Sequence, residues 1–170
     1  SIIAQRTCGS ELNISFIQQT DPHRYQRIIA LEHTTLQRIQ SVSNTMATNS
    51  STIIIPVVVH VVYNTSNQNI SENQINSQIQ VLNEDFRRLN SDGVNTPTAF
   101  SGLASDVEIE LRLASIDPNG NPTNGITRTS TTTTGFSWTA DDVKNSSSGG
   151  QNAWYSRNYL NIWVCNITKP

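Results

Sequence analysis

The spacing of hydrophobic positions changes several times along this 170-residue chain, and each change predicts a different element. The first regular pattern predicts a helix that follows Asp21, because Asp21 suits a helix cap and Pro22 suits the first helical position. The apolar residues that fall largely on one face of this helix are Tyr25, Ile28, Ile29, Leu36 and Ile39. We therefore predict that the N-terminal forty residues form a helical appendage.

A linker and a buried strand follow this helix. The stretch SVSNTMATNSS, residues 41–51, has almost no apolar periodicity and is typical of a linker. Val57–Tyr63 is almost wholly apolar and β-branched, which indicates a strand buried on both faces of a mostly parallel sheet, with Pro56 at its entrance. We accordingly divide the chain into residues 1–51 and residues 52–170.

The second part of the chain alternates strand and helix patterns. Ser71 and Gln74 form a capping box at the start of an amphipathic helix. The apolar residues at helical spacing after it are Ile75, Ile79, Leu82, Phe86 and Leu89. Val107–Leu113 then alternates apolar and charged residues, as a strand with one solvated face does, and Tyr159–Ile167 is the last predicted strand. This order favours a βαβ unit in an α/β (α+β) fold.

Composition limits the function classes that fit the chain. A net charge of -2, with 14% charged residues and no basic cluster, argues against a nucleic-acid partner. The most apolar stretch, IIIPVVVHVVY, is too short for a membrane span. Low charge combined with abundant Ser, Thr and Asn is typical of secreted or cell-surface proteins, which is the location we expect.

Titratable residues form no recognisable catalytic pattern. The three histidines are His23 and His33 in the first predicted helix and His60 in the apolar strand. We interpret His60 as a core histidine with satisfied hydrogen bonds rather than as a metal ligand. Glu84 and Asp85 adjoin two arginines and are predicted to form surface ion pairs. No nucleophile triad is indicated, because no histidine has a supported partner.

Six segments together resemble the pappalysin-like zinc metallopeptidases, a branch of the metzincins. They lie between residues 55 and 167, in the order of that family: IPVVVHVVYN, ISENQINSQIQVLNEDFRRLN, VEIELRLAS, NGITRT, SSGGQNAW and YLNIWVCNI. The resemblance implies that residues 52–170 form an incomplete N-terminal (upper) subdomain, with a mostly parallel twisted sheet and a backing helix. It also implies that residues 1–51 are a helical pro-segment. The complete protein would be a secreted zinc endopeptidase with protein or peptide substrates.

The segment RTCGS, residues 6–10, also resembles the pro-segment of this family, in which a cysteine is proposed to bind the catalytic zinc and keep the zymogen silent. By this resemblance Cys8 is the candidate cysteine switch, a latency ligand to zinc. Gly9 would let the backbone pass closely through a cleft, and Arg6 would pair with an acidic group beside it. The residues alone leave two alternatives open: Cys8 is a free surface thiol, or it forms a disulfide with Cys165.

The zinc motif of the family, HExxHxxGxxH, is absent from this chain. Zinc is therefore expected in the complete enzyme, and the chain alone is expected to bind none and to be inactive. Its partner would be a missing C-terminal catalytic half. The alternative is a truncated, non-catalytic module that binds partners or self-associates through an exposed sheet edge at Tyr159–Ile167.

Overall fold

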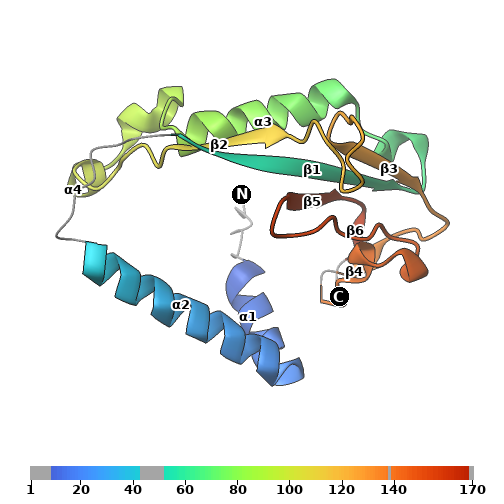
Figure 1. The fold of residues 1–170 in the computed structure, drawn as a ribbon, viewed down its shortest axis with the longest axis horizontal. Helices are drawn as coiled ribbons and strands as arrows, with labels where there is room; N and C mark the ends of the chain where they lie inside the picture. The colour runs from blue at the N-terminus through green and yellow to red at the C-terminus, as the bar shows by residue number, and fades with distance from the viewer. Residues whose placement is uncertain (1–8, 43–51, 138, 169–170) are drawn as a thin grey trace, which may run out of the picture. The chain divides into compact units, whose positions relative to one another are not determined.

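The computed structural model describes residues 9–42, 52–137 and 139–168 of the chain, which divides into two compact units, Ser1–Asn49 and Ser50–Pro170 (Figure 1). Two helices, α1 (Gly9–Thr20) and α2 (Pro22–Val42), form the described part of the first unit. Asp21 Oδ1 accepts a hydrogen bond from the Arg24 N–H over 2.9 Å, which confirms the predicted helix cap.

The sequence predicted a helical appendage over the first forty residues but did not identify α1 as a separate helix, because its apolar residues are few and are separated by polar ones. Among the side chains of α1 whose burial is described, residues 13–20, Ile17 is the buried apolar one, at 5% exposure. The apolar face predicted for α2 is only partly covered: Tyr25 and Ile28 are half-buried, whereas Leu36 and Ile39 are exposed within this structure.

The second unit is built on a four-stranded sheet in which all pairings are parallel. Its strands are β1 (Ile53–Tyr63), β2 (Ile109–Leu113), β3 (Ile126–Ser130) and β5 (Leu160–Val164). β2 pairs with the first half of β1, β3 with the second half, and β5 with the middle. The predicted mixture of helices with a parallel sheet is therefore confirmed.

Backbone hydrogen bonds show that β2 and β3 share one edge of β1. The Val57 carbonyl accepts from the Ala114 N–H, and the Val59 N–H donates to the Gly125 carbonyl, each over 2.8 Å. Residues two apart in a strand direct their backbone groups to the same edge, so the odd residues of β1 face β2 and β3 and the even residues face β5. The predicted turn DPNGNPTNG is thus an excursion within one interrupted edge strand.

One face of the sheet packs against α3 (Glu72–Phe86) and forms the core. Ser71 Oγ accepts from the Gln74 N–H over 3.2 Å, as the capping pattern predicts. The buried core residues are Val57, Val59, Val61, Ile75, Ile79 and Leu111. Burial of one such side chain stabilises the fold by about 1.5–3 kcal/mol. The predicted apolar stripe is confirmed as far as Leu82. It is wrong at Leu89, which lies beyond the helix and is 73% exposed.

Pro56 is the fourth residue of β1 and does not lie at the predicted entrance of the strand. Its ring nitrogen faces the edge where β5 pairs, but β5 begins only opposite Val57. The missing N–H therefore removes no hydrogen bond from the sheet, and β1 can begin earlier than a proline would otherwise allow.

The last predicted strand is divided into β5 and β6 (Ile167–Thr168), because at Asn166 the chain turns to pair with β4 (Phe136–Ser137). The Phe136 N–H donates to the Asn166 carbonyl over 2.8 Å. The remaining elements are short turns of helix: η1 (Ser66–Gln68), η2 (Ser91–Asn95), α4 (Thr98–Ser101), η3 (Asp142–Lys144) and η4 (Ser146–Ser148).

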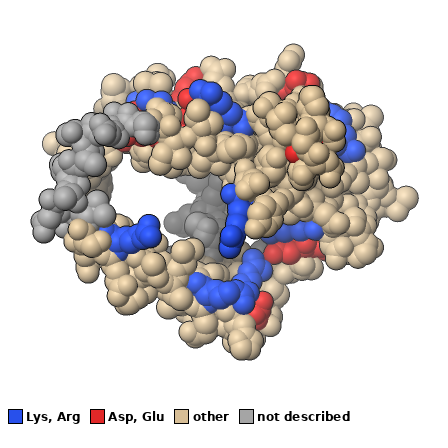
Figure 2. Space-filling view, in the orientation of Figure 1, with Lys and Arg blue, Asp and Glu red and all other residues tan. Residues whose placement is uncertain are grey.

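Charged residues are sparse on the surface. On the face drawn in Figure 2, Lys and Arg form small separate groups, several of them beside Asp or Glu. Across the described ranges, no helix combines the length and the hydropathy that crossing a bilayer requires.

Candidate functional site

The residues predicted to regulate the zymogen lie at the N-terminus. Arg6 and Cys8 fall outside the described residues, and Gly9 is the first residue of α1. Their predicted roles therefore remain predictions.

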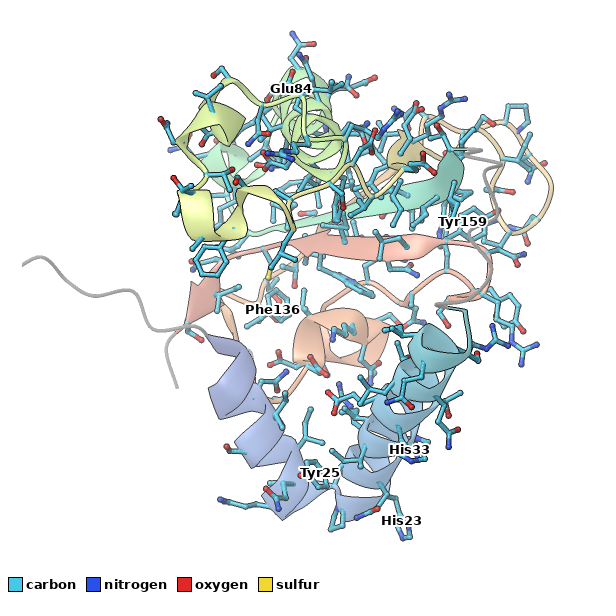
Figure 3. The ribbon with its side chains drawn as sticks, turned by 90° about the vertical axis from the view of Figure 1, so that its left-hand side faces the viewer. His23, Tyr25, His33, Glu84, Phe136 and Tyr159 are labelled. Carbon is cyan, nitrogen blue, oxygen red and sulfur yellow. The ribbon has the colours of Figure 1, made fainter. Side chains whose placement is uncertain are left out.

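The described histidines do not converge on a metal site. His23 and His33 project from α2 (Figure 3), and His60 lies in the sheet of the other unit. No three His, Cys, Asp or Glu side chains of the described residues form a group that could hold a metal ion. The described residues thus do not by themselves provide a ligand set for a catalytic zinc.

His60 is instead the centre of a buried polar cluster on the sheet face opposite α3. Its side chain is fully buried. Nδ1 lies 2.7 Å from Thr127 Oγ1 of β3, and Nε2 lies 2.9 Å from Asn161 Oδ1 of β5. Both ring nitrogens therefore have partners from the two strands that flank β1, which confirms the interpretation of His60 as a satisfied core histidine.

The hydrogen bonds of Asn161 determine which nitrogen of His60 carries the proton. Asn161 Oδ1 also accepts from the Trp154 N–H over 2.7 Å, and Asn161 Nδ2 donates to the Trp154 carbonyl over 3.0 Å. Because Oδ1 can only accept, His60 Nε2 donates to it, and His60 Nδ1 accepts from the Thr127 hydroxyl. Burial lowers the pKa of His60 below its ordinary value, so the neutral ring is favoured.

Two tryptophans complete the cluster. The ring of Trp163 lies 5.1 Å from that of His60, and the ring of Trp154 lies 6.3 Å away in an edge-on arrangement. Trp163 Nε1 donates to the Gln151 carbonyl over 2.8 Å. The irregular segment that contains Gln151 and Trp154 is thereby fastened to the sheet, and the cluster acts as its anchor.

One outer edge of the sheet is capped at a single residue, and the other is open. At β2, the Asn83 side chain of α3 accepts from the Leu111 N–H over 2.7 Å and donates to the Leu111 carbonyl over 2.9 Å. It thus occupies the place of a neighbouring strand. At β5, no strand of the described residues pairs with the outer edge. The exposed edge predicted at the last strand is present over Leu160–Val164.

An apolar groove of about 510 Å³ lies beside this open strand. Ile75, Ile79 and Leu82 of α3 form one wall, and Ile162 and Val164 of β5 form another. Parallel sheets are normally covered on both faces, so an open apolar groove next to an unpaired edge marks a surface that suits further polypeptide.

Cys165, just after β5, carries a free thiol. Cys8 lies outside the described residues, so the pairing of the two cysteines stays a prediction. Burial raises the pKa of this thiol, and the nearby Asp142 carboxylate raises it further. A thiol kept protonated in this way is a poor metal ligand and a poor nucleophile.

The structural neighbours of this chain are a metallopeptidase and its zymogen. They are named mirolysin and promirolysin. A mutant promirolysin from Tannerella forsythia aligns over 93% of this chain and 50% of its own chain, with 59% identity and a TM-score of 0.76. No protein-family model matches the chain, and no curated protein matches it.

Mature mirolysin matches a smaller part of the chain. Mirolysin in complex with compound 9 aligns over 69% of this chain and 44% of its own, with 68% identity and a TM-score of 0.67. Mature mirolysin from Tannerella forsythia, in complex with a cleaved peptide, aligns over 66% of this chain and 42% of its own, with 68% identity and a TM-score of 0.65. The chain thus spans half or less of the length of these neighbours.

The sequence did not predict the residues that complete the buried cluster. Thr127, Gln151 and Asn161 are polar residues in a chain rich in Thr, Asn and Gln, so nothing in the pattern distinguishes them. The one available signal was His60, since a buried imidazole in an apolar strand requires polar partners from neighbouring strands.

Proposed function

We propose that this chain is the pro-segment and the N-terminal portion of a secreted zinc endopeptidase zymogen. In this proposal the first unit is the pro-segment, and the second unit is the first part of a pappalysin-like, metzincin catalytic domain. The substrates would be proteins or peptides, consistent with the cleaved peptide named for mature mirolysin.

The observation that carries this proposal is the difference in coverage between the mature and the precursor neighbours. Residues 50–170 are 121 of the 170 residues, or 71% of the chain, and the two mirolysin structures cover 66 and 69%. Promirolysin covers 93%. Identity falls from 68 to 59% in the longer alignment, so the added residues differ more from their counterparts. A pro-segment that is removed on maturation accounts for both differences.

The proposed partner of the second unit is a C-terminal catalytic half that supplies the zinc site. The open edge of β5 and the apolar groove between α3 and β5 are surfaces that such a half would cover. The chain alone is then expected to be inactive. The alternative, a non-catalytic module that self-associates through β5, uses the same open edge and differs in requiring no further polypeptide.

The proposed latency device is Cys8. A thiolate is a strong zinc ligand, and in the fourth coordination position it would exclude the water that attacks the peptide bond. Gly9 and Arg6 would assist by close backbone passage and by pairing with an acidic group. Cys165 does not suit this role, because its surroundings keep the thiol protonated.

The test is activation of the full-length precursor after the substitution Cys8→Ala. Loss of the zinc ligand should shorten the lag before peptidase activity appears, whereas Cys165→Ala should leave the lag unchanged. Equal lags in all three proteins would contradict the cysteine switch. A precursor with no peptidase activity after removal of the first unit would contradict the broader proposal.

A further inference from the structure

Two Asn-Gly pairs lie close together in the segment that joins β2 to β3. They are Asn119-Gly120 and Asn124-Gly125, within the sequence DPNGNPTNG. Asparagine is thermolabile, because the backbone nitrogen of the next residue attacks its side-chain amide. A following glycine has no Cβ that obstructs this attack, so both pairs share the same intrinsic reactivity. The fold, however, gives them different surroundings.

The first pair forms the tip of an exposed hairpin turn. The Asp117 N–H donates to the Asn121 carbonyl over 2.8 Å, and the Gly120 N–H donates to the Asp117 carbonyl over 3.0 Å. Asn119 and Gly120 are both exposed. A Cβ added at Gly120 would meet no atom within 4 Å beyond the adjoining residues. The tip can therefore change its backbone conformation at the cost of hydrogen bonds within the turn alone.

The second pair is built into the sheet. Asn124 Oδ1 accepts from the Ile126 N–H over 3.2 Å, at the first residue of β3. Gly125 is buried, and its carbonyl accepts from the Val59 N–H of β1 over 2.8 Å. An added Cβ at Gly125 would lie 2.6 Å from the Ala114 nitrogen, so this backbone has no room to rotate. Attack by the Gly125 nitrogen would first have to open the bond to β1.

The reaction is a ring closure followed by hydrolysis. The Gly120 nitrogen forms a bond with Asn119 Cγ, the bond from Cγ to Nδ2 breaks, and Nδ2 leaves as ammonia with the proton that the Gly120 nitrogen gives up. Water then opens the cyclic imide at either carbonyl, which gives aspartate or isoaspartate. No oxidation or reduction is involved. Either product adds one negative charge to a chain whose net charge is -2.

We propose that Asn119 is a site of spontaneous deamidation in the folded chain, and that the fold protects Asn124 from the same reaction. The product places a second carboxylate beside Asp117, whose Oδ1 accepts from the Asn119 and Asn121 N–H groups over 2.9 and 2.8 Å. Isoaspartate also inserts a methylene group into the main chain of the turn, so the modification loosens this hairpin. This inference does not depend on the peptidase proposal, since every contact that it uses lies within the second unit.

The experiment incubates the purified 170-residue chain at pH 8, with a parallel sample in guanidinium chloride. After the denaturant is removed, trypsin releases both pairs in one peptide, residues 113–128, because it cleaves after Arg112 and Arg128. Fragmentation mass spectrometry then assigns each replacement of NH2 by OH to one asparagine, and a sample digested before incubation gives the baseline. The two sites are thus compared within the same molecule.

The folded chain should convert Asn119 at least about tenfold faster than Asn124, because only Asn124 requires a sheet hydrogen bond to open. In guanidinium chloride the two rates should agree within about threefold, since both asparagines precede glycine. Isoaspartate should accompany aspartate, because the imide opens at either carbonyl. Asn119→Gln should abolish the rapid conversion, and the matched variant Asn124→Gln should leave it unchanged. Both asparagines are exposed, so circular dichroism should show folded variants.

Equal rates at the two asparagines of the folded chain would overturn the proposal. A folded-chain rate at Asn119 that is more than about tenfold below its rate in denaturant would overturn it too, because the turn would then be protective. Aspartate without isoaspartate would contradict the ring closure, since direct hydrolysis of the side chain does not pass through the imide.

Discussion

The imidazole of His60 and the carboxamide of Asn161 are joined by a hydrogen bond of 2.9 Å in the interior of the second unit. The bond links the central strand β1 to the open strand β5. Asn161 also holds the backbone of Trp154, so the pair connects the sheet to the irregular segment that covers it. Hydrogen bonds on the sheet face covered by this segment therefore hold the open strand β5 in place.

Substitution of Asn161 by alanine should destabilise the second unit. The change leaves the buried His60 Nε2–H and both backbone groups of Trp154 without this partner, and we expect the free energy of unfolding to fall by about 2–3 kcal/mol. Asn158→Ala, an exposed asparagine nearby, should change it by less than about 0.5 kcal/mol. Urea unfolding measures both, and equal effects would show that Asn161 is not an anchor.

Stability should depend on pH through His60. Because burial lowers the pKa of His60 in the folded chain, the unfolded chain takes up the proton first as the pH falls. Stability is complete above the ordinary pKa of about 6.5 and decreases below it, toward the lowered pKa of the folded state, by at most about 1.4 kcal/mol per pH unit. Urea unfolding between pH 7.5 and 5 measures this decrease. His60→Gln should remove it and His33→Gln should not; an unchanged decrease in His60→Gln would refute this assignment.

Asn83 should stabilise the fold through the outer edge of β2. In Asn83→Ala the N–H and carbonyl of the buried Leu111 lose their partners, at a cost of about 1–3 kcal/mol. Asn76→Ala, on the exposed surface of the same helix, should cost less than about 0.5 kcal/mol. Hydrogen exchange at the Leu111 N–H measures this loss directly, because that N–H loses its acceptor in Asn83→Ala and should exchange faster. Normal protection there in Asn83→Ala would contradict the role of this side chain.

Gly125 should not tolerate a side chain, because it returns the chain to the sheet beside Ala114. Its φ is +71°, and an added Cβ would lie 2.6 Å from the Ala114 nitrogen. Gly120 has a φ of +86° but open space around it, so Gly120→Ala measures the cost of a positive φ without a steric clash. We expect Gly120→Ala to cost about 1 kcal/mol and Gly125→Ala at least about 2 kcal/mol more than that. Thermal unfolding of the two variants would reveal the difference, and similar melting temperatures would argue against a close approach at Gly125.

The sequence predicted those elements that local pattern determines. The cap at Asp21, the helix after Ser71 and the buried strand at Val57–Tyr63 each follow from the chemistry of adjacent residues. The short helix α1 and the division of the last strand at Asn166 depend on contacts between distant segments, which spacing does not encode. The partners of His60 were missed for the same reason, since Thr127 and Asn161 are 67 and 101 residues away from it.

The candidate site was likewise predicted only in part. Resemblance pointed to a metallopeptidase precursor, and the similarity to promirolysin agrees with it at the level of a metallopeptidase zymogen. The roles of Arg6, Cys8 and Gly9 are implied by the family resemblance and stay predictions, because Arg6 and Cys8 lie outside the described residues and Gly9 is only the first residue of α1.

The intact mass of the protein in its native source, with zinc determined on the same sample, tests the central claim most directly. If the chain is the pro-segment and N-terminal portion of a zinc peptidase, the precursor will have a mass well above 18.8 kDa and will carry one zinc ion. A zinc-free species near 18.8 kDa would contradict the claim and would direct attention to the open edge of β5 as the functional surface.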